Sequence, residues 1–363
     1  MDLPLFNYTD QLLNIIGITK NEVEEKLNAI SGKHFITNPI LATLARTFFG
    51  NKYDMLIISV ADNDLLLTRL TGHILGSIRQ IIEDNQNYKL ELKRKFLSHS
   101  EGPFFSVYNE LFVCGYLEHL GYSTRLSSSK DSGKPDIFIS GENGFSSDVK
   151  TFPDMEFWLL DQIDILFPEI IDLINKSKNF YVMIFVTNTK NFKKEFPKLM
   201  VNLLSTGKAQ NGLSCMIVNM PNYQGRQVYS ISNNANNVTF RFVPNFSYDE
   251  KSFSDLTDKA TKQQQSMSSE GITWIMFPHP KPNNIERRLV WEVSGLPKRM
   301  QDRGVGLVLY EMFAEVDQSN ASRVNLHSGA DFLLKDKFSQ KINRLSFDEF
   351  ISSLLSIPTI IIR

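Results

Sequence analysis

The spacing of hydrophobic residues changes along the chain from a helical period to short alternating runs. Between Tyr8 and Leu97, apolar residues recur every three or four positions, most clearly over 11–29 and 62–83. After Ser100, a helical pattern over 104–120 is followed by short β-branched and aromatic runs with glycines and asparagines between them. The pattern therefore predicts a helical N-terminal segment, 1–99, followed by an α/β region.

Strands are predicted at 122–126, 136–140, 145–152 and 180–187, with a helix over 156–176 before the last of them. Gly121 ends the preceding helix, since glycine tolerates positive φ. The order helix, three strands, helix, strand indicates an α/β (α+β) core with a mixed central sheet flanked by helices. We assign this core to 100–205.

The remainder of the chain, 206–363, is predicted to be a C-terminal α+β region. Its expected strands are 213–219, 227–232, 238–243, 273–277 and 289–293, and a polar helix is expected over 253–269. Whether this region packs on the core or forms a separate domain is open at this level. Recognition or dimerisation is the role we expect for it.

Composition narrows the class of protein. The 363 residues are 42% hydrophobic and 22% charged, which is ordinary for a globular chain. Basic and acidic residues nearly balance, 39 against 40, so bulk charge cannot carry nucleic-acid binding and any phosphate contact must be local. Two cysteines, Cys114 and Cys215, exclude a disulfide framework and a four-cysteine zinc site. With neither a basic leader nor a long apolar run, we expect a cytoplasmic protein without membrane contact.

Two neighbouring strands carry the residues with the clearest chemistry. Asp136 follows a proline at the start of one strand, and Asp148 and Lys150 lie in the next. Side chains alternate with a period of two along a strand, so Asp148 and Lys150 project from the same face. A turn at 141–144 would bring the Asp136 carboxylate beside that of Asp148. Adjacent carboxylates repel, and a hard divalent cation relieves that repulsion, so the pair predicts a metal site.

A third acid comes from the helix before these strands. Glu110 falls near the middle of the apolar arc of 104–120, whereas Glu118 falls toward its edge. A half-buried carboxylate is costly unless it is paired or metal-bound, so we expect Glu110 to face the two aspartates. His119 lies on the polar side of this helix and His279 in a proline-rich turn, and both are interpreted as structural.

These residues resemble the signature of the PD-(D/E)xK, or restriction-endonuclease-like, nuclease superfamily. Its pattern is a helix with a Glu, a Pro-Asp opening a strand, and an Asp or Glu, any residue, then Lys on the next strand. Here these are Glu110, Pro135-Asp136 and Asp148-Val149-Lys150, within 100–187. Some subfamilies add a Gln and a Tyr on the following helix. Gln162 stands there, but no tyrosine follows within 163–167.

The resemblance implies a restriction-endonuclease-like core that cleaves DNA. Glu110, Asp136 and Asp148, with the Val149 carbonyl, would bind Mg2+, for which Mn2+ substitutes, and Lys150 would complete the catalytic set. No phosphate-loop or dinucleotide motif occurs, so no nucleotide cofactor is expected. The predicted function is a metal-dependent DNA endonuclease of restriction or defence type, acting alone or as a homodimer.

Several interpretations stay open from the sequence alone. Lys130, Lys134, Lys259 and Lys262 are candidates for DNA contacts or plain surface, and the charged stretch 89–96 is interpreted as a solvated helix face. A non-catalytic DNA-binding or scaffold protein is one alternative, and a nuclease acting on RNA or on DNA ends is another. In a purely structural interpretation, Lys150 pairs with Asp148, and Glu110 accepts a hydrogen bond from a hydroxyl such as that of Ser127.

Overall fold

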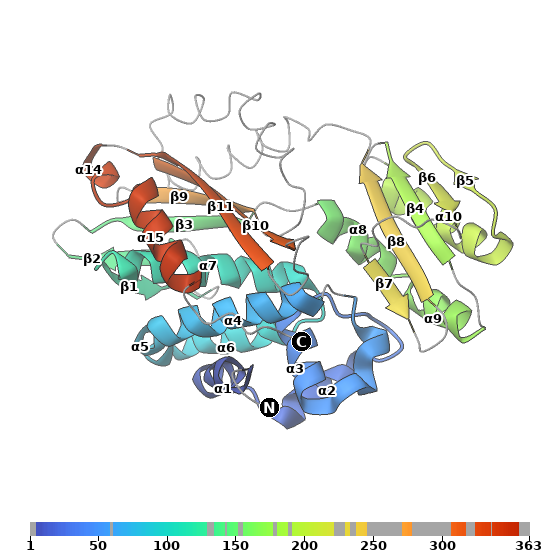
Figure 1. Cartoon of the computed structure of the whole chain (residues 1–363), viewed down its shortest axis with the longest axis horizontal. Coiled ribbons are helices and arrows are strands. Elements are labelled where there is room, and N and C mark those ends of the chain that lie inside the picture. Colours follow the sequence, from blue (N-terminus) through green and yellow to red (C-terminus); the bar gives the residue numbers. More distant parts are fainter. Residues whose placement is uncertain are drawn as a thin grey trace.

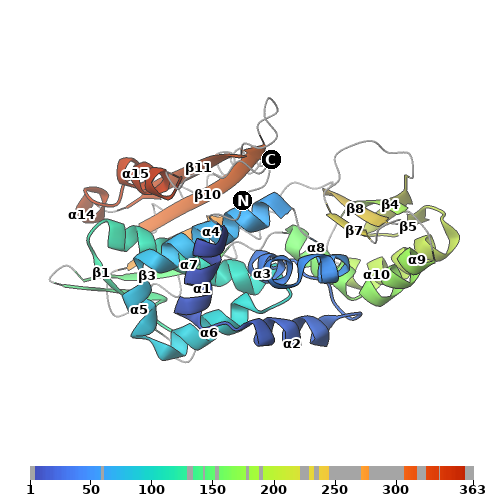
Figure 2. The ribbon, with the colours of Figure 1, turned by 60° about the horizontal axis from the view of Figure 1, so that its bottom comes forward.

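The chain folds as a mixed α/β protein. The structure, a computed structural model, describes residues 5–58, 61–128, 134–141, 144–151, 155–176, 180–187, 191–220, 229–232, 237–244, 271–277, 306–316, 324–334 and 336–355. The predicted helix 253–269 and strand 289–293 lie outside these residues. In the described part, two mixed sheets lie at opposite ends of the molecule in both views, with α8 (Met155–Asp164) between them (Figure 1, Figure 2).

The first sheet has the strand order β1-β2-β3-β9-β10-β11. Its strands are β1 (Ser123–Leu126), β2 (Ile137–Ser140), β3 (Ser146–Thr151), β9 (Gly271–Phe277), β10 (Gly306–Val316) and β11 (Val324–Leu333). β1, β2 and β3 form an antiparallel meander, β3, β9 and β10 run parallel, and β11 pairs antiparallel with β10. The predicted pairing of β2 with β3 across the 141–144 turn is confirmed, and strands from far along the chain extend this sheet.

The second sheet has the strand order β5-β6-β4-β8-β7. Its strands are β4 (Phe180–Val186), β5 (Gln210–Asn211), β6 (Cys215–Asn219), β7 (Tyr229–Ser232) and β8 (Asn237–Pro244). Our prediction that β4 shares the sheet of β1–β3 is therefore wrong. The free edge of β3 is taken by β9 instead, and β4, an almost fully buried apolar strand, is the middle strand of its own sheet.

Helices precede both sheets along the chain. They are α1 (Leu5–Ile16), α2 (Lys20–Ile30), α3 (Pro39–Phe49), the 3-10 helix η1 (Gly50–Leu56), α4 (Ala61–Ser77), α5 (Arg79–Glu83) and α6 (Gln86–Phe96). The single helix predicted over 11–29 is two helices. Gly17, with φ of 76°, ends the first, and Thr19 begins the second with a capping box that includes Glu22.

The remaining described helices cover the sheets. They are α7 (Glu101–His119), α9 (Phe167–Asn175), α10 (Phe192–Thr206), α14 (Asp336–Ser339) and α15 (Arg344–Leu355). α7 packs on β1 and β3, and α15 on α7 and β11, while α9 and α10 pack on the second sheet. The helix predicted over 156–176 is divided into α8 and α9, because Pro168 lacks an N–H and its ring clashes with the carbonyl four residues earlier. No helix in the described ranges is both long and apolar enough to cross a membrane.

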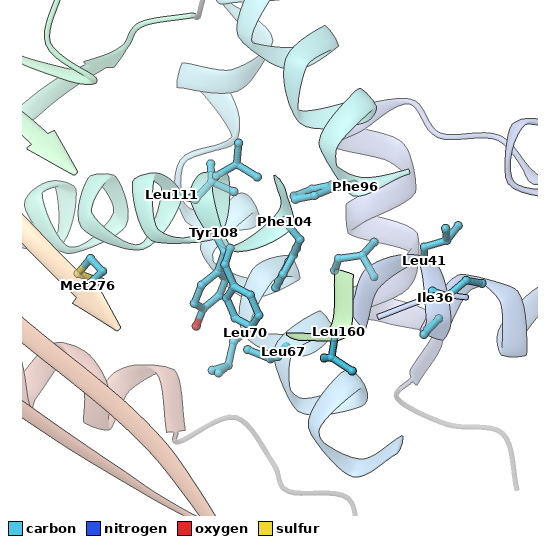
Figure 3. Packing of buried hydrophobic residues seen from close by; sticks show 14 of the residues in the cluster. Ile36, Leu41, Leu67, Leu70, Phe96, Phe104, Tyr108, Leu111, Leu160 and Met276 are labelled. Atoms are coloured by element: carbon cyan, nitrogen blue, oxygen red, sulfur yellow. The ribbon is translucent and has the colours of Figure 1, made fainter. Parts of the chain in front are cut away.

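Buried side chains of the N-terminal helices and of the first sheet belong to one hydrophobic cluster. Figure 3 shows Leu67 and Leu70 of α4 beside Tyr108 of α7, with Phe96 of α6 next to Phe104. At the other end of α7, the ring of Tyr116 meets the fully buried Trp274 of β9 with their centroids 5.7 Å apart. α7 is thus fixed between the N-terminal helices and the sheet.

Asn38 links two of the N-terminal helices. Its Oδ1 accepts hydrogen bonds from the N–H groups of Ile40 and Leu41 at the start of α3, and its Nδ2 donates to the carbonyls of Lys95 and Phe96. We expect Asn38→Ala to lower the free energy of unfolding by about 1–2 kcal/mol, because the cap and these bonds are lost together. Urea unfolding measures the change, with Asn202→Ala on the exposed face of α10 as the control. Equal stability of the two variants would contradict the prediction.

Candidate active site

The β2–β3 hairpin places Asp136 beside Asp148. The register pairs Ile137 with Ser147, so Asp136 lies level with Asp148 one step further along. The Asp136 N–H donates to Asp148 Oδ1 at 3.3 Å, and the Val149 N–H donates to Asp136 Oδ2 at 2.7 Å. Each aspartate is therefore held by the backbone of the opposite strand, and the predicted proximity of the two carboxylates is confirmed.

Two glycines make this hairpin possible. Gly141 has a φ of 119°, which L side chains rarely adopt. A Cβ on Gly144 would lie 2.9 Å from the carbonyl oxygen of Ile139, too close for any other residue. The turn predicted from these glycines is therefore required by the local geometry, and it sets the register that aligns the two aspartates.

Lys150 completes the group on the same face of β3. Its Nζ lies 3.9 Å from Asp136 Oδ2, rather than pairing with Asp148 as the structural interpretation expected. Val149 is level with Trp274, whose ring meets Tyr116 of α7, so Val149 faces that helix while Asp148 and Lys150 face away from it. The Lys150 side chain is 21% exposed and that of Asp136 is 27% exposed, so a ligand can reach both.

Glu110 of α7 is half-buried as predicted and lies within electrostatic reach of Asp136. Its Oε2 accepts a 2.8 Å hydrogen bond from the hydroxyl of Tyr88 on α6, so the hydroxyl partner is Tyr88 and not Ser127. Although the side chain retains some solvent contact, the protein around its carboxylate raises the pKa to about 7, first by burial and then by the charge of Asp136. Asp136 thus lies within electrostatic reach of Glu110 on one side and contacts Asp148 on the other.

The two aspartates also hold their protons more tightly than usual. Burial raises the pKa of Asp148 to about 6, against the lowering effect of Lys150, and burial likewise raises the pKa of Asp136. Asp148 is fully buried, and its Oδ2 has no hydrogen-bond partner among the residues that the structure describes. A buried carboxylate oxygen without a partner is costly, and a cation would satisfy it. The pair Asp136 and Asp148 therefore fits a divalent metal, and Glu110 is linked to this pair through its electrostatic interaction with Asp136.

A threonine from far along the chain lies next to Asp148. Thr273 of β9 is level with Asp148 in the parallel β3–β9 pair, so both side chains project from the same face. Thr273 is fully buried, and its hydroxyl also lacks a partner within the described ranges. Sequence reasoning did not single it out, since the pairing of β3 with β9 joins segments more than a hundred residues apart.

Helix α6 contributes a second cation. The Lys95 side chain is 15% exposed, and its Nζ lies 2.9 Å from Glu91 and donates to Ser106 Oγ at 3.2 Å. Its charge lowers the pKa of both Glu110 and Asp136. Our interpretation of 89–96 as a solvated helix face is thus wrong for the side of α6 that bears Glu91 and Lys95. The four-residue spacing of the buried residues Tyr88, Leu92 and Phe96 was the signal that could have shown it.

The other residues singled out in the sequence either lie away from Asp136, Asp148 and Lys150 or lie outside the residues that the structure describes. Lys134 is exposed two residues before Asp136, whereas Lys130, Lys259, Lys262 and His279 lie outside the described residues. Glu118 accepts hydrogen bonds from the backbone and hydroxyl of Thr124, a structural role. Four more residues were named from the sequence: Gln162 and both cysteines are buried, and His119 lies exposed with its ring against Phe350.

Comparison with known protein families, with curated proteins and with solved structures found no match for the chain.

Proposed function

We propose that the protein is a metal-dependent nuclease that hydrolyses DNA phosphodiester bonds, built on a restriction-endonuclease-like core. One observation carries the proposal: a backbone-bonded pair, Asp136 and Asp148, lies beside the Lys150 ammonium, with the Asp136 charge acting on Glu110. The helix and the hairpin supply these side chains in the pattern of the PD-(D/E)xK signature. That resemblance supports the proposal beside the geometry.

The acids would hold one or two Mg2+ ions, or Mn2+ in their place. Asp136, Asp148 and Glu110 are the carboxylate ligands in this proposal, and the Val149 carbonyl is a fourth oxygen donor. When bound, such an ion lowers the pKa of a coordinated water and stabilises charge on a phosphate. The buried Oδ2 of Asp148, which has no hydrogen-bond partner among the described residues, and the raised pKa values of Asp148 and Glu110 support their assignment as metal ligands.

The protein's own residues would bind, orient and stabilise the substrate. Lys150 carries the ammonium that would lie against the scissile phosphate and stabilise its developing negative charge. Tyr88 holds Glu110 in place through its hydrogen bond, and Lys95 favours the ionised forms of Glu110 and Asp136. These contacts assign Tyr88 and Lys95 positioning roles in the same site.

The choice of DNA rests on the resemblance and on local charge. Lys134 stands exposed two residues before Asp136, where its ammonium can meet a phosphate backbone. Restriction or defence, cytoplasmic location and a homodimer belong to the same proposal. A neighbouring methyltransferase gene would support restriction.

Cleavage assays test the proposal. Wild-type protein is incubated with supercoiled plasmid, linear duplex, single-stranded DNA and structured RNA, in Mg2+, Mn2+ or EDTA. We expect nicking or linearisation of DNA with either metal, none in EDTA, and at least about a 100-fold loss in Asp148→Asn. Asp172→Asn, an exposed change on α9, is the control. Cleavage of no substrate with any divalent metal would favour a non-catalytic scaffold, and cleavage of RNA or of ends alone would favour that nuclease class.

A further inference from the structure

A second group of potential metal ligands lies outside the carboxylate site. His34 follows α2, His99 precedes α7, and Asp164 ends α8, yet their ligand atoms lie within 4.8 Å of one another. His34 Nδ1 is 2.6 Å from Asp164 Oδ2, and His99 Nε2 is 3.5 Å from the same oxygen. Three segments that are far apart in sequence thus present two imidazoles and one carboxylate to a common point.

Backbone hydrogen bonds hold the Asp164 carboxylate and the His99 main chain in place. The Phe35 N–H donates to Asp164 Oδ1 at 2.9 Å, which leaves Oδ2 to face the histidines. The carbonyl of His99 accepts from the N–H groups of Thr37 and Asn38 at 2.9 and 3.1 Å. The two imidazole rings stack with centroids 4.5 Å apart. The hydrogen bond from Phe35 to Asp164 Oδ1 is of the kind that orients carboxylate ligands in known metal sites.

The donor set differs in kind from that of the first site. Two imidazole nitrogens and one carboxylate oxygen suit zinc, which is commonly held by three protein ligands with a fourth position open to water. Magnesium prefers oxygen ligands alone. Asp161, one helical turn before Asp164, lies within electrostatic reach of Asp164 and His99 and adds negative charge nearby.

We propose that His34, His99 and Asp164 form a Zn2+ site, distinct from the Mg2+ site of the proposed function. Zinc would bind through His34 Nδ1, His99 Nε2 and Asp164 Oδ2, with water in the fourth position. To bind zinc, His34 Nδ1 must carry no proton. The neutral imidazole meets this requirement when its proton is on Nε2 instead of Nδ1. The side chains of His34 and His99 are 43% and 29% exposed, so the ion can enter from solvent.

Bound zinc would join the N-terminal helices to α8, the helix that leads toward the second sheet. Because the ligands come from positions 34, 99 and 164, the site exists in the folded chain and not in the unfolded one. Zinc binding should therefore raise the midpoint of thermal unfolding, by an amount that grows with the logarithm of the ratio of free zinc to its Kd.

Zinc titration of the full chain, after metal removal with EDTA, tests the proposal against a competing chromogenic chelator. We expect one equivalent of Zn2+ to bind to the wild type and to His119→Ala, whose histidine is exposed on α7. In His34→Ala and His99→Ala the affinity should fall at least about tenfold. Asp164→Asn keeps an oxygen acceptor for Phe35 but loses the charge, and it should show the same loss. Asp148→Asn should still bind zinc, which separates this site from the nuclease proposal.

Thermal unfolding with and without Zn2+ supplies the second measurement. The midpoint should rise with zinc in the wild type and in His119→Ala, and should rise less at the same zinc concentration in the three ligand variants. If the wild type binds no zinc, or if the three variants bind it as tightly as the wild type, the proposal is overturned. The three residues would then be a hydrogen-bonded link between α8 and the N-terminal helices.

Discussion

Replacement of Lys150 by alanine is expected to slow DNA cleavage by about 100-fold or more while Mg2+ binding persists. The Lys150 ammonium lies 3.9 Å from Asp136 and is partly exposed, so it can meet both the metal ligands and the substrate phosphate. An alanine removes the charge that would stabilise the negative charge developing on the scissile phosphate, and it leaves the acids in place. Loss of a nearby cation also removes one competitor for the carboxylates, so metal binding should not weaken once they are ionised.

The measurement is a single-turnover cleavage rate with protein in excess, which separates the chemical step from binding. About pH 8 is suitable, because the pKa of Asp148, about 6, would rise further when Lys150 no longer lowers it. Lys176→Ala, an exposed lysine paired with Asp172 on α9, serves as the matched control. A variant that cleaves at the wild-type rate would remove Lys150 from the mechanism. If Lys150→Ala lost both Mg2+ binding and cleavage, Lys150 would be a structural partner of Asp136 instead.

The part of this site that the sequence predicts is the part made by local interactions. The two glycines of the β2–β3 turn and the period of two along β3 suffice to bring Asp136, Asp148 and Lys150 together. The position of Glu110 follows from helical periodicity in the same way. All four lie within about forty consecutive residues, where chain geometry leaves few alternatives.

The parts that were missed depend on contacts between distant segments. Nothing in the pattern of β9 shows that it pairs with β3, so Thr273 could not be placed beside Asp148. The sequence pattern predicts that β4 is a strand, but a local pattern cannot predict that β4 pairs with β8. The link from Tyr88 to Glu110 likewise needs the packing of α6 on α7. The cluster of His34, His99 and Asp164 joins three such segments, which no spacing rule connects.

The three acids share one physical property that makes a test without DNA possible. An acid whose pKa is raised by folding destabilises the folded state at high pH, because the folded protein binds its proton more tightly than the unfolded chain does. This cost is absent below the unfolded pKa, grows as the pH rises toward the folded pKa, and is complete above it. A bound metal would offset it, so metal-free protein should be most affected above neutral pH.

Glu110→Gln should therefore stabilise the metal-free protein at about pH 8. The pKa of Glu110 rises from its usual 4.5 to about 7, mainly through burial and then through Asp136. At about 1.4 kcal/mol per pKa unit, and allowing for residual solvent contact, the ionised carboxylate costs about 2–3 kcal/mol. Glutamine carries no charge, and its amide oxygen can still accept the Tyr88 hydrogen bond. The gain should shrink to well under half near pH 5, where the wild-type carboxyl is mostly protonated in the folded state.

Urea unfolding at both pH values, with EDTA and then with Mg2+, measures these effects. Mg2+ should stabilise the wild type and stabilise Glu110→Gln less, because one carboxylate ligand is missing. Glu22→Gln is the matched control. The hydrogen-bonded ion pair with Lys93 lowers the pKa of Glu22, so loss of the Glu22 charge should slightly destabilise the protein near neutral pH. If Glu110→Gln instead lowers stability at about pH 8 in EDTA, the carboxylate is a favourable structural partner of Tyr88. Its inclusion among the metal ligands would then be wrong.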